Sequence, residues 1–332
     1  MNQDKINVAV IAGGDSGEYT ISLKSASIIM KYLEGEKYAP FLVHIKFGEW
    51  YCLLPDSTKV EIDKNDFSIT VDKKKIRFDV VFTAIHGTPG EDGKLQGYFD
   101  LLGIPYTSCG SITSALTFNK AFCNKVVAST GVTVSPSVHL IKGYEFSIDD
   151  ILATTGLPCF VKPNCGGSSV GMSKVKEKEH LLEAIETAFK EDNEVLVEKY
   201  VKGREITCGV FKAGEQIIAL PIVEVVSKKE FFDYEAKYTD NLAEELIPAP
   251  IDSATEIKCK ETSILLYKAL NCKGVVRFDY IFNESVLNFL EVNTVPGMSS
   301  ASIVPKMAQY QGYTLNSFYD ILITEAMKQK MK

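Results

Sequence analysis

The chain of 332 residues has no long apolar run, no excess of basic residues and no closely spaced cysteine pair. No run approaches the roughly 18 apolar residues of a membrane-spanning helix, so the sequence predicts no transmembrane segment. Its 36 Lys and Arg residues are outnumbered by 43 Asp and Glu residues, which gives a net charge of −7. This balance argues against nucleic-acid binding, because such proteins concentrate basic side chains against phosphates.

Two further absences bear on where the protein works. The eight cysteines are irregularly spaced and include no C-x-x-C pair, which favours reduced, mostly buried thiols over disulfides. The first residues lead directly into a short apolar strand and lack the basic flank and longer apolar core of a secretion signal. We therefore expect a cytoplasmic protein.

The length allows two or three domains, and the first third of the chain predicts an α/β domain over residues 1–108. An apolar strand at 6–12 is followed by two glycines and by helical spacing over 22–33. Further strands are expected at 38–45, 79–84 and 104–106. This alternation predicts an open parallel sheet covered by helices.

The remainder predicts two more domains, a central α+β domain over 109–198 and a C-terminal domain over 199–332 with a mainly antiparallel sheet. A helical pattern runs from 114 to 130, and 231–249 is the longest irregular segment and a candidate mobile loop. The other expected elements are extended segments at 134–140, 159–162, 194–200, 204–212 and 216–226, and helices at 180–189 and 315–327.

Four polar residues in two neighbouring strands form the first candidate site. Alternation along a strand places Arg277 and Asp279 on one face of the first strand, and Glu291 and Asn293 on one face of the second. A three-residue turn at 283–285 would set Arg277 opposite Glu291 and bring all four onto one surface. Such oxygen ligands suit Mg²⁺ bound together with phosphates. The alternative is an exposed hairpin with an ion pair between Arg277 and Glu291.

A glycine-rich segment forms the second candidate site. Lys162 is followed, within residues 163–171, by three glycines and two serines. Glycine lets backbone N–H groups approach phosphate oxygens, so the segment predicts a loop that covers phosphates. The order of residues is not that of a P-loop, and a flexible hairpin turn is the alternative. Lys120 is a candidate second cation, although an isolated lysine is usually solvated.

The strand at 195–201 and the turn that follows it are a weaker signal. Extended backbone at a strand exit can meet an adenine edge, and Glu205 can accept from ribose hydroxyls. A surface ion pair of Glu205 with Arg204 or Lys202 is the simpler interpretation. No repeat or low-complexity stretch is present.

Taken in order, these segments resemble the ATP-grasp superfamily and, within it, the D-alanine–D-alanine ligase family. The resemblance implies an ATP-grasp fold and runs nearly from end to end. The motifs that carry it, besides Lys120, Lys162 and Glu205, are Gly13-Gly-Asp-Ser-Gly-Glu18, His86-Gly-Thr-Pro-Gly-Glu-Asp-Gly93, Gly166-Gly-Ser-Ser-Val-Gly-Met172, Glu198-Lys-Tyr-Val201, Phe232-Asp-Tyr-Glu-Ala-Lys-Tyr238, Arg277-Phe-Asp279 and Glu291-Val-Asn-Thr-Val-Pro-Gly297, continuing to Pro305.

The resemblance implies ATP and two Mg²⁺ ions, with Mn²⁺ as a substitute, as cofactors. The implied ATP contacts are Lys120 and Lys162 at the phosphates, Glu198, Lys199, Tyr200 and Val201 at the adenine, Glu205 at the ribose, Phe231 and Leu290 at the purine and Lys237 at the terminal phosphates. The implied metal ligands are Asp279, Glu291 and Asn293.

The resemblance also implies the substrate contacts. Glu18 would bind the ammonium of the first D-alanine and form a hydrogen-bonded triad with Ser168 and Tyr238, while Arg277 and a backbone N–H near Gly297 would stabilise an oxyanion. His86, Ser302 and Ile303 would complete the substrate pockets. Two departures from the family pattern, Ala301 and the pair Tyr19-Thr20, leave details of substrate binding open.

The implied reaction joins two D-alanine molecules through a D-alanyl phosphate, releases ADP and phosphate, and serves peptidoglycan precursor synthesis. Relatives are usually homodimers, and the loops at 166–170 and 231–249 would act as lids that exclude water. Three alternatives compete with this prediction. They are a ligase for other amino acids, a non-catalytic nucleotide sensor, which would be expected to lose Arg277 or a metal carboxylate, and a periplasmic-type binding protein, which would need an export signal.

Overall fold

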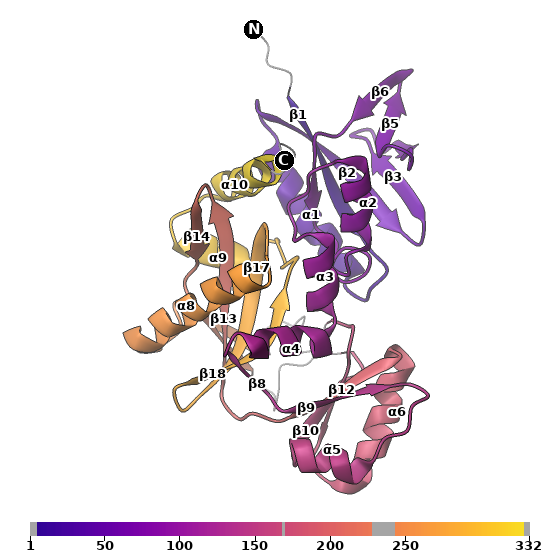
Figure 1. Ribbon diagram of the computed structural model, residues 1–332. Coiled ribbons are helices and arrows are strands. Elements are labelled where there is room, and N and C mark those ends of the chain that lie inside the picture. Colours follow the sequence, from indigo (N-terminus) through magenta and orange to yellow (C-terminus); the bar gives the residue numbers. More distant parts are fainter. Residues whose placement is uncertain (1–4, 168–169, 228–242, 329–332) are drawn as a thin grey trace.

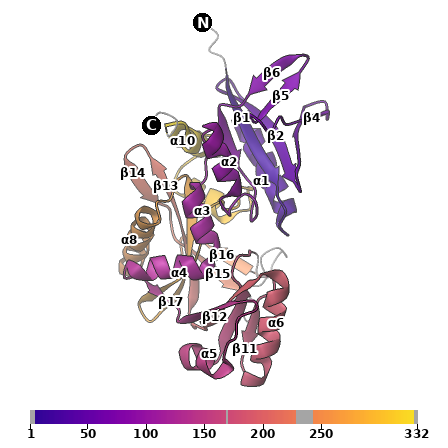
Figure 2. The same cartoon turned by 45° about the vertical axis from the view of Figure 1, so that its right-hand side comes forward.

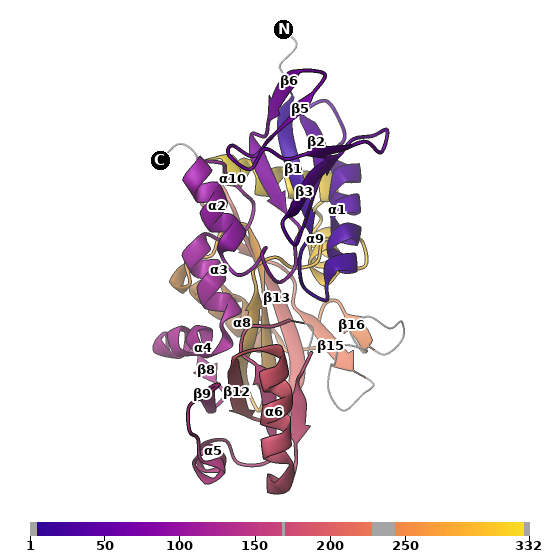
Figure 3. The ribbon, with the colours of Figure 1, turned by 90° about the vertical axis from the view of Figure 1, so that its right-hand side faces the viewer.

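The computed structural model describes residues 5–167, 170–227 and 243–328. Three lobes, each built on its own sheet, follow one another along the molecule (Figures 1, 2 and 3). The N-terminal lobe lies at one end, the central lobe at the other, and the C-terminal lobe between them. No helix within these ranges has both the length and the apolar character needed to cross a membrane.

The N-terminal lobe contains a five-stranded sheet with the order β4-β3-β2-β1-β7. Strands β1, β2 and β7 are parallel, and β1 is buried along most of its length, as expected for a parallel strand covered on both faces. The predicted parallel sheet is confirmed for these three strands, and β3 and β4 extend it with an antiparallel edge that was not predicted. The elements are β1 (Ile6–Gly13), α1 (Tyr19–Leu33), β2 (Tyr38–Lys46), β3 (Glu49–Leu53), β4 (Lys59–Glu61), β7 (Val80–Thr83) and α2 (Lys94–Leu102). The strand expected at 104–106 is reduced to one bridge between Val81 and Tyr106.

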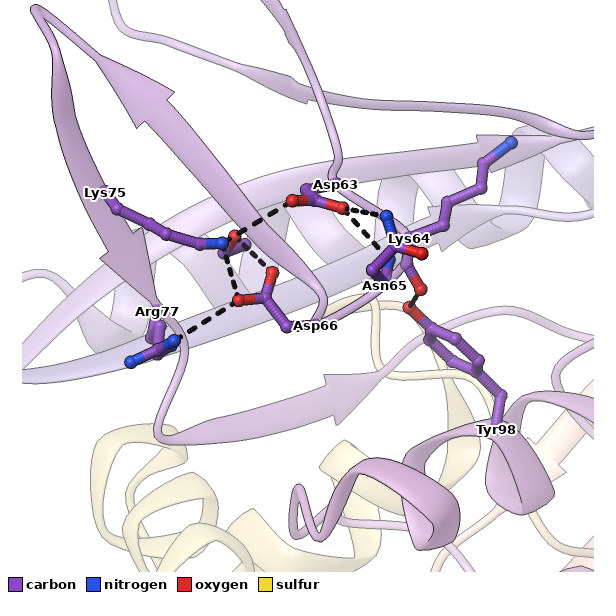
Figure 4. A network of polar contacts seen from close by, with 8 residues as sticks. Asp63, Lys64, Asn65, Asp66, Lys75, Arg77 and Tyr98 are labelled. Atoms are coloured by element: carbon purple, nitrogen blue, oxygen red, sulfur yellow. Dashed lines mark hydrogen bonds and ion pairs between the residues drawn. The ribbon is translucent and has the colours of Figure 1, made fainter.

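A separate hairpin, β5 (Ser68–Val71) with β6 (Lys74–Arg77), covers the outside of this lobe. Asp66 accepts from Lys75 and Arg77, and Tyr98 donates to the carbonyl of Lys64 (Figure 4). Half-exposed ion pairs of this kind contribute little to stability.

The helix expected over 114–130 is instead two helices, α3 (Ser111–Phe118) and α4 (Lys120–Ser129). Asn119 between them has extended backbone, and its side chain accepts from the N–H of Phe122. Asparagine at an N-cap satisfies an orphan donor, so it favours a fresh helix start over continuation. The break places Lys120 at the first position of α4.

The central lobe holds an entirely antiparallel sheet with the order β11-β10-β12-β9. Its apolar face packs against α5 and α6 and forms a core of its own. The elements are β9 (Ser137–Ile141), α5 (Ile148–Thr155), β10 (Cys159–Pro163), β11 (Ser173–Val175), the short 3-10 helix η1 (Lys178–His180), α6 (Leu181–Glu191) and β12 (Glu194–Lys199).

The C-terminal lobe has the order β16-β15-β13-β17-β18-β8, with β14 paired to β13. The predicted mainly antiparallel character is confirmed, since among the strands described in this sheet only β18 and β8 pair in parallel. The elements are β8 (Thr133–Val134), β13 (Arg204–Ala213), β14 (Gln216–Ala219), β15 (Val223–Ser227), β16 (Ala243–Leu246), α8 (Ser253–Ala269), β17 (Val275–Asn283), β18 (Val286–Asn293), α9 (Ile303–Tyr310) and α10 (Leu315–Lys328). The strand predicted at 216–226 is therefore two strands, and part of the predicted loop 231–249 is β16.

One hydrophobic core joins the N-terminal and C-terminal lobes. Residues of β1 and β7 pack in the same cluster as Phe211 of β13, Met307 of α9 and Phe318 of α10. The central lobe has a separate core. Helices α3 and α4 lie between the N-terminal lobe and the central lobe (Figure 2). All eight cysteines are free and seven are buried, which confirms the predicted reduced thiols.

Candidate active site

The four polar side chains of the β17–β18 hairpin lie on one face, as predicted, but in a different register. Asp279 pairs with Glu291 and Arg277 with Asn293, so the expected pairing of Arg277 with Glu291 is wrong. The turn has only two residues, Glu284 and Ser285, both with positive φ. The register then shifts by one residue beside Asp279, where β18 bulges. Beyond the bulge the two changes together shift the pairing by two residues, which keeps these four polar side chains on one face.

Asp279 is the centre of a hydrogen-bonded cluster on this face. Its Oδ1 accepts from Arg277 Nε at 2.8 Å and from Thr207 Oγ1 at 2.5 Å, and its Oδ2 accepts from Arg277 Nη2 at 2.7 Å and from Asn293 Nδ2 at 3.0 Å. Burial lowers the pKa of Arg277, but the negative charges of Asp279, Glu291 and Glu205 more than reverse this and raise its pKa overall. The guanidinium is therefore a fixed positive charge among carboxylates.

Thr207 was not singled out in the sequence. It is fully buried on β13, where it pairs directly with Asp279. Because Glu205 lies two residues earlier on the same strand, alternation places both on one face. That spacing is the signal that would have identified Thr207.

A cavity of about 740 Å³ opens over this face. Residues of the N-terminal and C-terminal lobes, of helices α3 and α4 and of the glycine-rich loop line it. The predicted site residues that line it are Glu18, His86, Lys120, Glu205, Arg277, Asp279, Glu291, Asn293, Gly297, Ser302 and Ile303.

The glycine loop of the central lobe meets both Lys120 and Glu18. Lys120 Nζ donates to the carbonyl of Gly166 at 2.5 Å. A Cβ on Gly167 would lie 3.0 Å from Glu18 Oε2, so glycine allows the loop to approach this carboxylate closely. The predicted phosphate loop therefore lies close to Glu18, the residue predicted to bind the substrate ammonium.

Lys162 and Glu198 form an ion pair beyond this cavity, in the central lobe. Lys162 of β10 contacts Glu198 of β12 at 2.5 Å, and the side chains are only 10% and 6% exposed. Neither lines the cavity, nor do Lys199, Tyr200, Val201 and Leu290. Leu290 is the bulged residue of β18. Ser168, Phe231, Lys237 and Tyr238 lie outside the described residues.

His86 is held between lobes by both ring nitrogens. Its Nδ1 donates to the carbonyl of Val295 at 2.7 Å, which can only accept, so Nε2 accepts from Ser25 Oγ at 3.3 Å. The N–H of Met298 donates to Ser25 Oγ at 3.2 Å. Burial lowers the pKa of His86, and the charge of Glu18 offsets part of this effect. Loss of hydration therefore favours the neutral form of the ring.

Glu91 lies within the motif from His86 to Gly93, and the sequence alone indicates no role for it. Its Oε2 accepts from the N–H of Gly87 at 2.7 Å and its Oε1 from the N–H of Val295 at 3.0 Å. The carboxyl lies deep in the cavity wall, where loss of hydration and the charge of Glu18 raise the pKa of Glu91 to about 8. The hydrogen bonds from these two N–H groups lower the pKa of Glu91, but by less than burial and Glu18 raise it.

This raised pKa predicts a specific pH dependence of stability. In the unfolded chain Glu91 titrates near its ordinary value of 4.5, so between pH 4.5 and about 8 the folded state holds more protons. Stability therefore falls as pH rises through this window, by at most about 1.4 kcal/mol per pH unit. Denaturant unfolding of wild type and Glu91→Gln at pH 5, 6.5 and 8 tests this. The free energy of unfolding of wild type, relative to that of Glu91→Gln, is expected to fall as pH rises. A difference that stays constant with pH would contradict this prediction.

Gly297, whose N–H is the predicted oxyanion donor, packs against Ser302, a predicted contact of the substrate. A Cβ at Gly297 would lie 2.7 Å from Ser302 Oγ. The Ser302 hydroxyl is itself held by the N–H and hydroxyl of Ser299, at 3.1 and 2.8 Å. Ser302 also precedes α9, whose first residue is Ile303.

Two family models match most of the chain. The model described as D-ala D-ala ligase N-terminus matches residues 7–109, and the model described as D-ala D-ala ligase C-terminus matches residues 126–324. The matched regions contain Glu18, the β17–β18 hairpin and Ser302.

Whole-chain relatives agree with these models. The D-alanine–D-alanine ligase of Phocaeicola vulgatus is 45% identical over 309 residues, which cover 93% of this chain and 95% of that protein. The ligase of Parabacteroides distasonis is 43% identical and covers 98% of this chain and 99% of its own.

Solved structures share the fold. The VanG D-Ala:D-Ser ligase from Enterococcus faecalis has a TM-score of 0.87 at 34% identity, covering 97% of this chain and all of that one. The D-alanine–D-alanine ligase from Bacillus anthracis complexed with ATP has a TM-score of 0.80 at 31% identity, covering 99% of each chain. With the family models, the full-length relatives and the cavity in agreement, the chain belongs to the D-alanine–D-alanine ligase family of ATP-grasp enzymes, which join two D-alanine molecules with the use of ATP.

Proposed function

We propose that the cavity over the β17–β18 hairpin is where ligation takes place, with Asp279, Glu291 and Asn293 as ligands of two Mg²⁺ ions. The observation that carries this proposal is the convergence of these three oxygen-bearing side chains with Arg277 on one face. Two carboxylates and an amide suit a hard cation whose remaining ligands are phosphate oxygens and water. Mn²⁺ would fit the same donors. When bound, the ions neutralise the charge on the transferring phosphoryl group.

The protein's own cations would hold the nucleotide. Lys120 lies at the start of α4 and reaches the carbonyl of Gly166, so it is placed to exchange that partner for a phosphate oxygen. Lys162 would also contact the phosphates, Glu198 would line the adenine pocket and Glu205 would hold the ribose. The purine pocket would be completed by Lys199, Tyr200, Val201, Phe231 and Leu290. Lys237 would reach the terminal phosphates.

Glu18 would fix the first D-alanine. Its carboxylate lines the cavity beside Gly167, where it can accept from a substrate ammonium. The substrate carboxylate would then point at the γ-phosphate held over the hairpin and attack it, forming D-alanyl phosphate and ADP. Ser168 and Tyr238 would close this side of the site.

The second D-alanine would lie between His86 and the start of α9. Ser302 and Ile303 would bind its carboxylate, and its free amine would attack the carbonyl of D-alanyl phosphate. Arg277 and the N–H of Gly297 would stabilise the oxyanion that forms, in a site from which water is excluded. Collapse of this intermediate releases phosphate and leaves D-alanyl-D-alanine, a precursor for peptidoglycan.

The packing of Gly297 against Ser302 gives a direct test of this arrangement. Gly297→Ala would push the Ser302 hydroxyl away from Ser299, so kcat/KM for D-alanine should fall between about tenfold and 100-fold. Steady-state kinetics at saturating ATP measure it. Gly35→Ala is the matched control, because a Cβ there meets nothing within 4 Å. Equal kinetics for the two variants would contradict the proposed second-substrate pocket.

Choice of the second substrate is tested with the wild-type enzyme. ATP, Mg²⁺ and D-alanine are supplied with D-alanine, D-serine or D-lactate as acceptor, and products are identified by mass. D-serine is included because the VanG relative is named a D-Ala:D-Ser ligase. We expect D-alanyl-D-alanine as the main product near neutral pH, since Tyr238 is absent from relatives that make the ester. Efficient ester formation would contradict the assignment of Tyr238.

Three further features belong to this proposal. The protein works in the cytoplasm as a homodimer, and its domains divide near residues 108 and 198. The resemblance to the family supports all three.

A further inference from the structure

Glu91 is a cavity-lining carboxylate that the mechanism above does not use. It belongs to the N-terminal lobe, yet one of its oxygens accepts from Val295, 204 residues further along the chain. The other oxygen accepts from Gly87, which directly follows His86. Glu91 therefore connects two segments that the proposed function places at the second substrate.

Glu91 makes two of three hydrogen bonds that, with the peptide link from His86 to Gly87, form a closed ring. Glu91 holds the N–H of Val295, the carbonyl of Val295 accepts from His86, and the N–H of the next residue, Gly87, returns to Glu91. Hydrogen bonds in such a network strengthen one another, so the loss of one weakens the hold on the other members. Ser25, bonded to His86 and Met298, secures the same segment three residues later.

Val295 occupies a sensitive place in the chain. It lies two residues after Asn293, a proposed metal ligand, and two residues before Gly297, whose N–H is a proposed oxyanion donor. A displacement of Val295 would move both groups relative to Glu18 and His86 in the N-terminal lobe.

The surroundings of Glu91 are unfavourable for a carboxylate. Glu18 and Glu291 both repel its negative charge, and the part of the chain that the structure describes provides no ion pair for it. An acidic side chain kept in such a place, with both oxygens committed to backbone N–H groups, indicates a role in the site rather than in general stability.

We infer that Glu91 is a positioning residue for the ligation, setting the segment from Asn293 to Gly297 against His86 across the junction of the N-terminal and C-terminal lobes. It acts through Val295 and Gly87 and touches no reacting atom. The inference rests on the proposed roles of Asn293, Gly297 and His86.

The test compares Glu91→Gln and Glu91→Ala with Asp92→Asn. Gln keeps the shape but presents an amide N–H to one of the two backbone donors, so it breaks one bond of the ring; Ala removes both. Asp92 is the matched control, because among the described residues its carboxylate accepts only from neighbours in its own loop, Thr88 and Lys94. Thermal unfolding verifies that each variant is folded.

We expect kcat for dipeptide formation to fall about 100-fold in Glu91→Gln and further in Glu91→Ala, while the KM for ATP stays within about threefold of wild type. Phosphate release should exceed dipeptide formation, because a misplaced oxyanion donor leaves the acyl phosphate to water. Asp92→Asn should keep both values close to wild type. This split between kcat and KM, with uncoupled phosphate release, is not expected from a merely structural residue.

Folded Glu91→Gln and Glu91→Ala enzymes with near wild-type kcat and coupled phosphate release would overturn the inference. So would an equal loss in Asp92→Asn. Glu291→Gln, assayed in parallel, separates this result from a failure of the proposed function. If Glu291→Gln is inactive and the Glu91 variants are not, only the role of Glu91 is wrong; if Glu291→Gln is fully active, the proposed site itself is wrong.

Discussion

Replacing Arg277 with alanine is expected to lower kcat for dipeptide formation by about 1,000-fold while leaving ATP affinity within a few-fold of wild type. The guanidinium faces charge that develops only after the nucleotide is bound, so its loss affects the transition state more than binding. Asp279 keeps its hydrogen bonds from Thr207 and Asn293 in the variant, which preserves the metal-binding face. Steady-state kinetics and calorimetric nucleotide titration measure the two effects separately.

The chain offers a matched control for this variant on the neighbouring strand. Arg204 makes the same type of bidentate contact, to Glu224 at 2.7 and 2.6 Å, but neither residue lines the cavity. Arg204→Ala should therefore lose a comparable ion pair and retain most of its ligase activity. Normal dipeptide formation by Arg277→Ala, or an equal loss of kcat in Arg204→Ala, would contradict the oxyanion role.

The second large effect is expected at the ion pair of Lys162 and Glu198. Lys162→Met leaves a carboxylate without its cation in an environment where the side chain is 6% exposed, so the free energy of unfolding should fall by about 3–5 kcal/mol. The variant should also fail to bind ATP, because Lys162 is a proposed phosphate contact. Denaturant unfolding and nucleotide titration give the two measurements.

A double variant separates stability from binding at this pair. Lys162→Met with Glu198→Leu replaces both charges by apolar groups of similar volume, a change that is often neutral or stabilising. We expect its stability to return close to wild type while ATP binding stays absent. A double variant that binds ATP as wild type does would show that the pair serves the fold alone.

The polar face of the hairpin could be predicted from sequence because it depends on alternation and not on register. The turn is one residue shorter than expected and β18 bulges at Leu290, yet the two deviations leave Arg277, Asp279, Glu291 and Asn293 on one side. Side-chain direction has a period of two, so a shift by two preserves it. Either change alone would have placed the polar residues of the two strands on opposite faces of the sheet.

Other features depend on contacts that spacing cannot reveal. The break between α3 and α4 follows from one side-chain hydrogen bond of Asn119, within a run whose apolar spacing is helical throughout. The importance of Glu91 arises from a partner 204 residues away, and the edge strands β3 and β4 depend on pairing with β2. Tertiary contacts of this kind decide between local alternatives that the sequence leaves nearly equal.

The central claim is that the face formed by Asp279, Glu291 and Asn293 binds two divalent ions with the nucleotide. The most direct test is the number of Mn²⁺ ions bound per chain, counted by electron paramagnetic resonance in the presence of a non-hydrolysable ATP analogue. Glu224→Gln is the control, since Glu224 is a buried carboxylate of the same sheet that does not line the cavity. The account predicts two ions for wild type and for Glu224→Gln, and one or none for Glu291→Gln. Two ions bound to Glu291→Gln with wild-type affinity would contradict it.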